Sequence, residues 1–272
     1  MKIPASAGLA LALATLLAAA VPARAQLLFS TPPAQQARLG RPFPAALLAR
    51  LQQASRLGLR MTRVPQPLYL KAIAGPTLGR PPALLYVGAE FCPYCAAQRW
   101  GVVLTLLRFG RLTGLTYMLS SAHDVFPDTP TVSFTGARFD SAVLALQAFE
   151  TADREQKPLM RMPAPAQRIF RRFDVPPYTA FAYGIPFVYL DGRYLLTQPM
   201  ISPGSLSGMG WGQVVAQLDD PRSALFAAIM PRVNLLSAAI CRVDGGRPAA
   251  VCRAPGVAAA GAALARLPTA AH

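Results

Sequence analysis

The sequence contains the stretch ALLYVGAEFCPYCAAQRW at residues 83–100, in which an apolar run leads into two closely spaced cysteines. The run at 83–87 has the length and composition of a strand that is buried on both faces. Residues 92–109 suit a helix, because Pro93 falls in the first turn, where its missing N–H costs nothing, and Gly110 is placed to end it. We therefore expect a strand, a short turn and then a helix that begins at the first cysteine.

The motif Cys92-Pro93-Tyr94-Cys95 sets two thiols one helical turn apart. Cys92 would sit at the helix N-terminus, where unpaired backbone N–H groups and the helix dipole favour the thiolate over the thiol. A thiolate attacks a partner disulfide to give a mixed disulfide, which Cys95, deeper in the helix, would resolve. The motif therefore predicts thiol–disulfide exchange with Cys92 and Cys95 as catalytic residues and no cofactor.

Other segments of the chain carry weaker secondary-structure signals. Residues 184–190 are apolar, and Asp191-Gly192 joins them to 193–196 in a pattern typical of a β-hairpin. The remaining expected strands lie at 67–73 and 115–120, with a hairpin formed by 131–139 and 143–149. Helices are expected at 43–57, 164–173, 211–218 and 222–240, the last interrupted at Pro231.

The order of these features resembles the thioredoxin superfamily. A strand runs into the CxxC motif, a helix follows, and Ile185-Pro186 begins a later strand and hairpin. The resemblance implies an α/β, thioredoxin-like fold in which Pro186 is cis and lies against the dithiol. It also implies that Ile185, Pro186 and Tyr94 bind the substrate, with Ile185 offering its backbone.

A closer resemblance covers most of the chain after its first residues. The stretches that carry it are 86–100, 128–131, 185–188 and 238–241 continuing to Cys252. They look like an exported thioredoxin-like family that is catalogued only as a domain of unknown function, the one numbered 929. This resemblance supplies a fold but little about function.

Two departures from ordinary thioredoxins bear on activity. Tyr86 stands where thioredoxins carry a buried acid, and about ninety residues separate the motif from Pro186 instead of a few dozen. We expect an inserted segment at about 121–180, between the CxxC helix and strand and the cis-proline strand. The departures argue against a strong general reductase activity.

The N-terminus has the pattern of an export signal. Lys2 precedes an apolar run at 7–21, and Ala23-Arg24-Ala25 has the small-x-small form of a cleavage site. We expect cleavage after Ala25, a secreted or periplasmic location and no membrane span in the mature chain. The expected organisation is a signal peptide at 1–25, a lead-in and helix at 26–65, a thioredoxin-like domain at 66–253 and a flexible tail at 254–272.

Export would place the other two cysteines where disulfides persist. Cys241 and Cys252 are separated by ten residues that include Asp244-Gly245-Gly246. We expect them to form a structural loop disulfide, the alternative being a relay to the motif. The expected partners are exported proteins with thiols or disulfides and a redox partner protein.

The formal charge of +15 raises the question of nucleic acid. Only three of the 27 basic residues are lysines, and the arginines are scattered, the one tight cluster being Arg168, Arg171 and Arg172. No basic stripe alternates with aromatic residues, as single-strand binding grooves require, so we expect no nucleic-acid partner.

Several alternatives remain open at this level. The dithiol could be an inert disulfide, half of an all-cysteine zinc site with Cys241 and Cys252, or a copper ligand with methionine or histidine, although we expect no metal. The soft-ligand candidates are Met160, Met162, Met200 and Met209. His123 precedes Asp124, but no serine in a nucleophile-elbow setting accompanies it. A catalytically silent peptide-binding module is the main competing function.

Overall fold

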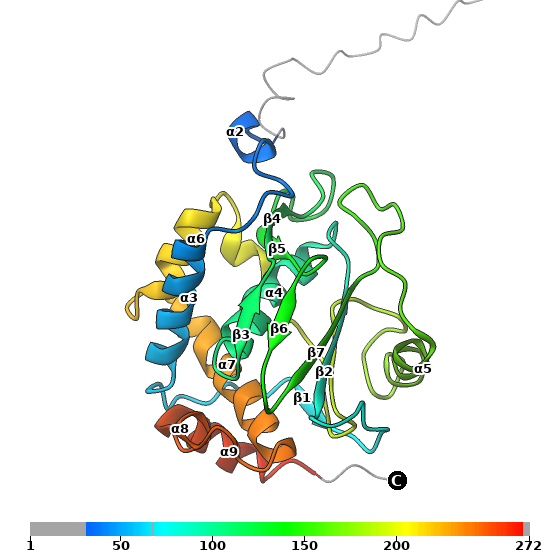
Figure 1. Cartoon of the computed structure of the whole chain (residues 1–272), viewed down its shortest axis with the longest axis vertical. Coiled ribbons are helices and arrows are strands. Elements are labelled where there is room, and N and C mark those ends of the chain that lie inside the picture. The colour runs from blue at the N-terminus through cyan, green and yellow to red at the C-terminus, as the bar shows by residue number, and fades with distance from the viewer. Residues whose placement is uncertain (1–30, 67, 269–272) are drawn as a thin grey trace, which may run out of the picture. The chain divides into compact units, whose positions relative to one another are not determined.

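The computed structural model describes residues 31–66 and 68–268, and the expected signal peptide at 1–25 lies outside them. The central element is a mixed five-stranded sheet with the strand order β1-β9-β8-β2-β7. Its strands are β1 Leu70–Ala72, β2 Ala83–Gly88, β7 Ala145–Glu150, β8 Phe187–Leu190 and β9 Tyr194–Leu196. Figure 1 shows β2 and β7 of this sheet side by side. Helices pack on the sheet, which confirms the predicted α/β class.

Strand β2 is buried along its whole length because both faces of the sheet are covered. Leu84 and Tyr86 point into the larger hydrophobic core, whereas Leu85 and Val87 point into a second core on the opposite face. Strand β2 pairs with β7 in parallel and with β8 in antiparallel orientation. A strand with two apolar neighbours and two covered faces needs a continuous apolar run, which is what 83–87 supplies.

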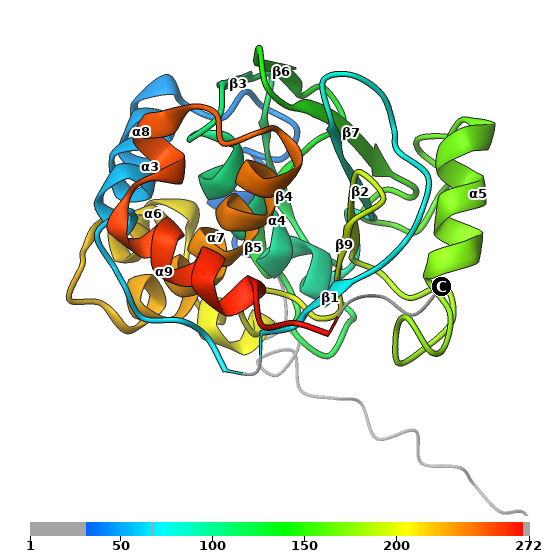
Figure 2. The same cartoon turned by 90° about the horizontal axis from the view of Figure 1, so that it is seen from below.

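Helices α4 (Pro93–Leu106) and α7 (Ala224–Val243) pack together on one side of the sheet, and α5 (Ala164–Phe173) lies on the other (Figure 2). Helix α3 packs on α6 and α7, so the residues before the sheet belong to the larger core. The other helices are α2 Pro33–Gln36, α3 Ala45–Gly58, η1 Pro203–Leu206, α6 Trp211–Asp219, α8 Ala249–Cys252 and α9 Pro255–Leu264.

Two small sheets fill the connection between α4 and β7. Strand β3 (Arg111–Thr113) pairs with β6 (Arg138–Asp140), and β4 (Thr116–Leu119) pairs with β5 (Pro130–Ser133). The predicted hairpin of 131–139 and 143–149 is therefore wrong. Strand β7 joins β2 instead, which lets its alternate residues pack on the two cores. The segment expected as an insertion thus contains a strand of the central sheet.

Helix α7 runs through Pro231 without a break, contrary to the expected interruption. Pro231 is buried, and the Arg232 guanidinium donates to the Ala228 carbonyl at 2.9 Å within the same turn. Core packing on both sides of the proline outweighs the lost backbone hydrogen bond. The helix is also long and apolar enough to cross a membrane, which the sequence interpretation overlooked, but 72% of its apolar window is buried inside the fold.

The expected flexible tail at 254–272 contains helix α9, which packs on α7. Gly256 makes this contact possible, since a Cβ there would lie 2.3 Å from Asn234 Nδ2 and 2.4 Å from the Met61 carbonyl oxygen. The Gly256 amide also donates to the Leu59 carbonyl at 2.8 Å. The small residues after 254, which predict a flexible tail, are the ones that allow α9 to approach α7 closely.

Candidate active site around Cys92 and Cys95

Cys92 is the N-cap residue of α4, directly after the turn that follows β2. Its Sγ accepts a hydrogen bond from the backbone N–H of Cys95 at 3.2 Å, and Pro93 occupies the first helical position. Capping by a sulfur satisfies one of the N–H groups that every helix start leaves free. The sulfur of Cys92 is therefore held at the positive end of the helix dipole.

The segment before β8 lies against this cysteine. Cys92 Sγ is 3.7 Å from the carbonyl oxygen of Ile185, and the Ile185–Pro186 peptide bond is cis. Cys92 keeps 6% of its surface exposed and Cys95 none, whereas Tyr94 between them is 42% exposed. The structure thus brings Cys92, Cys95, Ile185, Pro186 and Tyr94 to one place, with Cys92 as the outer thiol.

The two thiols differ in acidity for identifiable reasons. A hydrogen bond from the Cys95 side chain, followed by N–H donors of the helix start and the nearby Arg99 charge, holds the pKa of Cys92 below its ordinary value despite burial. Burial raises the pKa of Cys95 well above that value, and the adjacent Cys92 sulfur adds to the effect. Cys92 is consequently the better thiolate and Cys95 is held as a thiol.

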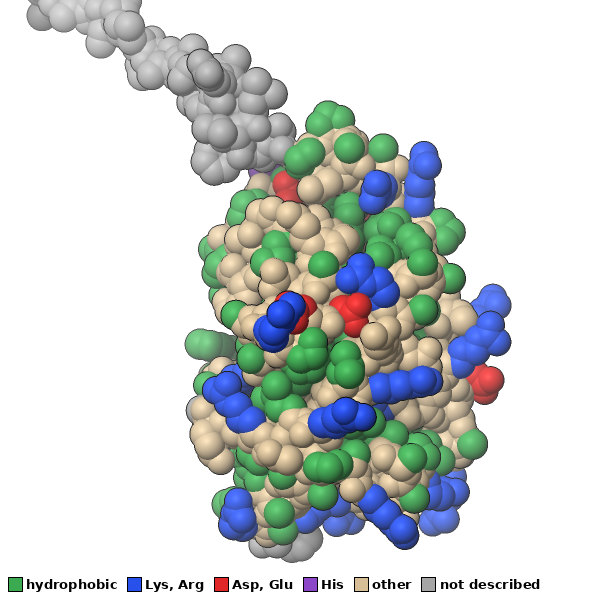
Figure 3. All heavy atoms as spheres, turned by 90° about the vertical axis from the view of Figure 1, so that its left-hand side faces the viewer, with side chains coloured by type: hydrophobic (Ala, Val, Ile, Leu, Met, Phe, Trp, Pro, Cys, Tyr) green, Lys and Arg blue, Asp and Glu red, His purple; other side chains and the backbone are tan. Residues whose placement is uncertain are grey.

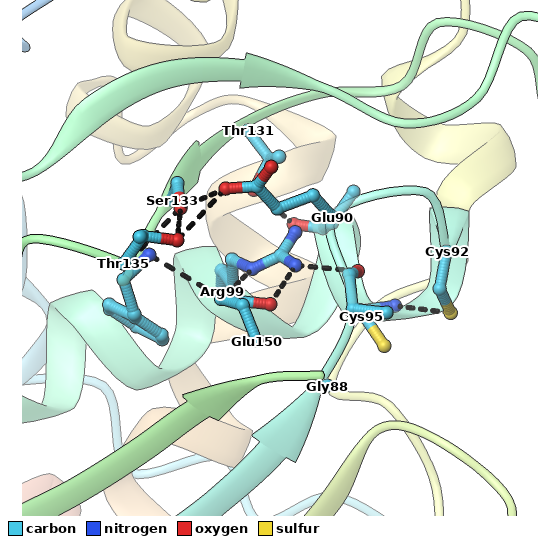
Figure 4. A network of polar contacts seen from close by, with 12 residues as sticks. Gly88, Glu90, Cys92, Cys95, Arg99, Thr131, Ser133, Thr135 and Glu150 are labelled. Carbon is cyan, nitrogen blue, oxygen red and sulfur yellow. Dashed lines mark hydrogen bonds and ion pairs between the residues drawn. The ribbon is translucent and has the colours of Figure 1, made fainter. Parts of the chain in front are cut away.

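A buried ion pair lies behind the dithiol (Figure 4). Arg99, one turn after Cys95, donates from Nε and Nη2 to the two carboxylate oxygens of Glu150 at 2.8 and 2.6 Å. Nη2 also donates to the Ala89 carbonyl at 2.7 Å, in the turn that precedes Cys92. Both charged side chains are fully buried, so the pair fixes the turn and places a cation near the sulfur atoms.

Sequence reasoning missed this pair. The available signal is that Arg99 is the only charged residue between 93 and 107, in a helix otherwise suited to a core. An arginine in that setting requires a buried acid, because an unpaired buried charge is strongly unfavourable. Glu150 could not be identified from the sequence, since its position at the end of β7 depends on the parallel pairing with β2.

A second acid, Glu90, lies two residues before Cys92. Its carboxylate accepts hydrogen bonds from the hydroxyls of Ser133 at 2.5 Å and Thr135 at 3.0 Å (Figure 4). Burial raises the pKa of Glu90, and these two hydroxyls oppose that rise. Glu90 thereby ties the turn before the motif to β5 and the residues after it.

The side chain of Tyr86, in the strand that leads to the motif, is fully buried. Its ring packs edge-on against Phe134, and its hydroxyl sits where a Cβ of Gly88 would be, at 2.3 Å. Within residues 31–66 and 68–268, neither Tyr86 Oη nor Arg99 Nη1 has a hydrogen-bond partner. Glycine at 88 is thus required for the close approach of the Tyr86 hydroxyl.

Apolar side chains are exposed on the segments around Cys92. Tyr94 contacts Phe126 edge-on, and Val125 beside it is 72% exposed. On the segment that leads to Ile185, Phe181 is 80% and Tyr183 58% exposed. The Tyr94–Phe126 contact places Tyr94 and Val125 close to Cys92, whereas Tyr183 packs on Phe170 of α5. Exposed apolar groups beside a reactive side chain are typical of a surface that binds another molecule.

Cys241 and Cys252 form a disulfide between α7 and α8, with 5.7 Å between their Cα atoms. Their sulfur atoms are therefore bonded to each other in this structure, whereas Cys92 and Cys95 are free thiols. Because Cys241 and Cys252 are bonded to each other, the four cysteines do not form the zinc site considered from the sequence. That the disulfide is structural and not a relay to the motif stays a prediction.

The remaining sequence candidates lie in other settings. His123 is exposed, Met160 Sδ accepts from the Glu150 amide at 3.5 Å, and Met200 packs on Gly101. Met162 and Met209 pack at the edges of the two cores.

Basic side chains on the face that carries α3 and α6 are spread among apolar and uncharged ones (Figure 3).

Comparison with known proteins gives one finding about ancestry. No match was found among curated proteins or among solved structures. The family model described as "Domain of unknown function (DUF929)" matches residues 77–242. That range includes β2, the dithiol, Arg99, Glu150 and Ile185-Pro186, and it covers more than half of the chain. The chain therefore belongs to the DUF929 family.

Proposed function

We propose that this protein is a thiol–disulfide oxidoreductase of the thioredoxin superfamily that acts on exported proteins. The observation that carries the proposal is the position of Cys92. Its sulfur caps α4, has a lowered pKa and faces the Ile185 carbonyl, while Cys95 is buried beside it. This is the asymmetry that an attacking thiolate and a resolving thiol need.

The exchange proceeds in two balanced steps. The Cys92 thiolate attacks one sulfur of a substrate disulfide, so that a bond from Cys92 to that sulfur forms and the other sulfur leaves as a thiolate, which takes a proton. Cys95 then loses its proton to water or to a substrate thiolate and attacks Cys92 Sγ. The bond from Cys92 to the substrate sulfur breaks, and that sulfur leaves as a thiolate, which takes a proton. The motif ends as a disulfide and the substrate as two thiols, which is a transfer of two electrons. A redox partner protein restores the dithiol, and the reverse sequence oxidises a substrate.

The surroundings supply a way to hold a protein substrate. An extended chain beside Cys92 can donate a backbone N–H to the Ile185 carbonyl, as the resemblance to thioredoxins implies. The exposed apolar groups of Tyr94 and Val125 offer contact area for side chains near the target disulfide. Tyr94 lies in the first turn of α4 and Val125 on a loop, the kind of segment on which binding residues are concentrated.

An extracytoplasmic location is part of the proposal. It is supported by the signal-like pattern of residues 1–25 and by the Cys241–Cys252 disulfide, since structural disulfides persist in oxidising compartments. The direction of the reaction, whether oxidase, isomerase or reductase, is set by the redox potential and by the partner.

Turnover in vitro tests this function. Disulfide-scrambled ribonuclease A in a glutathione buffer would be incubated with wild type, Cys92→Ser or Cys241→Ala/Cys252→Ala protein. We expect wild type and the Cys241/Cys252 variant to accelerate recovery of ribonuclease activity, because both keep the dithiol, and Cys92→Ser to have no effect.

The competing function is a silent peptide-binding module, which the small exposure of Cys92 favours. If wild type binds a reduced, unfolded substrate yet accelerates neither reshuffling nor reduction of its disulfides, the exchange proposal is overturned in favour of that module.

A further inference from the structure

A cavity of about 790 Å³ lies on the side of the sheet away from the dithiol helix. It is bounded by β7, by α5 and by the loop at residues 76–78. Figure 2 shows α5 on this side, across the sheet from α4 and α7. We call this space the α5 cavity. Its volume is in the range of sites that hold small organic ligands.

The inner walls of the α5 cavity are apolar. Phe149 of β7 and Ile169 and Phe173 of α5 line it, together with three prolines. Ile169 and Phe173 belong to the second hydrophobic core, which fixes their positions. Gln147 of β7 is one of the few polar side chains among the lining residues. Such walls suit a hydrocarbon or aromatic body.

Two arginines stand at the same cavity. Arg168 and Arg172 are four residues apart, so they lie one above the other on a single face of α5 together with Ile169. The Arg172 guanidinium lies over the Phe173 ring, 5.3 Å from its centre. Within the described part of the chain, no acidic side chain forms an ion pair with either arginine. Their positive charge is therefore available to a ligand.

We propose that the α5 cavity binds an amphipathic organic anion, with its apolar body against Phe149, Ile169 and Phe173 and its acidic group at Arg168 and Arg172. Charge complementarity and the apolar walls together select this class, since an acidic group can form ion pairs with the two exposed guanidinium groups that a neutral apolar molecule cannot form. The site is separate from Cys92 and goes beyond the proposed exchange function.

A matched pair of fluorescent probes tests this site. 8-Anilinonaphthalene-1-sulfonate is an amphipathic anion, and N-phenyl-1-naphthylamine has the same aromatic body without the charge. We expect the sulfonate probe to bind wild type at one site and more tightly than the neutral probe. Arg168→Gln/Arg172→Gln should weaken sulfonate binding by about tenfold, because two exposed ion pairs are lost, and leave the neutral probe unchanged.

Three variants make the result specific. Arg171→Gln, on the same helix but outside the cavity lining, should change neither affinity. Gln147→Trp, which fills the cavity from β7, should abolish binding of both probes. Cys92→Ser/Cys95→Ser should bind like wild type, so that this test is independent of the exchange function. Equal affinity for the two probes, or sulfonate binding that survives both the double arginine variant and Gln147→Trp in folded protein, would overturn the proposal.

Discussion

Arg99 Nη2 and Glu150 Oε2 are 2.6 Å apart in an ion pair that has no exposed surface and lies one helical turn beyond Cys95. The pair joins α4 to the end of β7, the strand that flanks β2, and through the Ala89 carbonyl it reaches the turn before Cys92. It is therefore the structural link between the sheet and the dithiol.

Breaking this pair from either side should have the same effect on stability and opposite effects on the thiol. Arg99→Met and Glu150→Gln each leave one buried charge unpaired and should each lower the free energy of unfolding by about 3 kcal/mol. Because the Arg99 cation lowers the pKa of Cys92, Arg99→Met should raise that pKa, and Glu150→Gln should lower it further.

Urea unfolding and the pH dependence of iodoacetamide alkylation measure the two effects. Shifts of the Cys92 pKa in the same direction for both variants would mean that the pair acts only by holding the fold.

Tyr86→Phe should be neutral or stabilising, by up to about 1 kcal/mol, because it removes a buried hydroxyl that has no partner in the described residues. Tyr189→Phe is the matched control on the neighbouring strand β8. Its hydroxyl donates to the Pro76 carbonyl at 2.6 Å, so this change should cost about 1 kcal/mol. Denaturant unfolding of both variants decides the matter. A clear loss of stability in Tyr86→Phe would show that the hydroxyl is hydrogen-bonded in solution.

Asp174, at the end of α5, gives the fold a pH dependence of known sign. Burial raises the pKa of Asp174 from 3.8 to about 6. The folded state therefore binds this proton more tightly than the unfolded state, and the contribution of Asp174 to stability is full below pH 4 and is lost as the pH rises through 6. Asp174→Asn should remove this dependence.

The difference in unfolding free energy between Asp174→Asn and wild type should accordingly grow from pH 4 to pH 6 and then level off. Thermal or urea unfolding of both proteins across that interval measures it. A difference that stays constant from pH 4 to 7 would show that Asp174 ionises normally.

The Cys241–Cys252 disulfide should be structural only. Replacing both residues with Ala removes the constraint on a short loop and should cost about 3 kcal/mol of stability. The alkylation rate of Cys92 should not change, because the disulfide joins α7 to α8 and neither helix carries a residue of the motif. A change in Cys92 reactivity in the folded variant would instead support a relay between this disulfide and the motif.

The parts of this fold that depend on local chemistry could be predicted from the sequence. The continuous apolar run of β2, the proline at the start of α4 and the Asp191-Gly192 turn each specify a conformation within a few residues, and all three are present. The motif likewise placed Cys92 at a helix start. Each of these features is fixed by backbone geometry near the residues that reveal it.

The parts that depend on distant partners could not be predicted. The alternating pattern at 143–149 fits a strand of a local hairpin as well as a strand of the central sheet. Only the parallel pairing with β2, which the sequence does not reveal, decides between the two. Pro231 predicts an interrupted helix and the small residues after 254 predict a flexible tail, yet burial against neighbouring helices outweighs both local preferences. Glu150 is a site residue only because the pairing of β7 with β2 places its carboxylate beside Arg99.

The most direct test of the exchange mechanism is the capture of a mixed disulfide by the purified protein. Cys95→Ser and Cys92→Ser would each be mixed with a peptide that contains one disulfide, quenched with acid at intervals and analysed by mass spectrometry. The account predicts a covalent adduct on Cys92 that accumulates in Cys95→Ser, because no resolving thiol remains, and little or no adduct in Cys92→Ser, whose only motif thiol is buried. Equal adduct formation in both variants, or none in either, would contradict it.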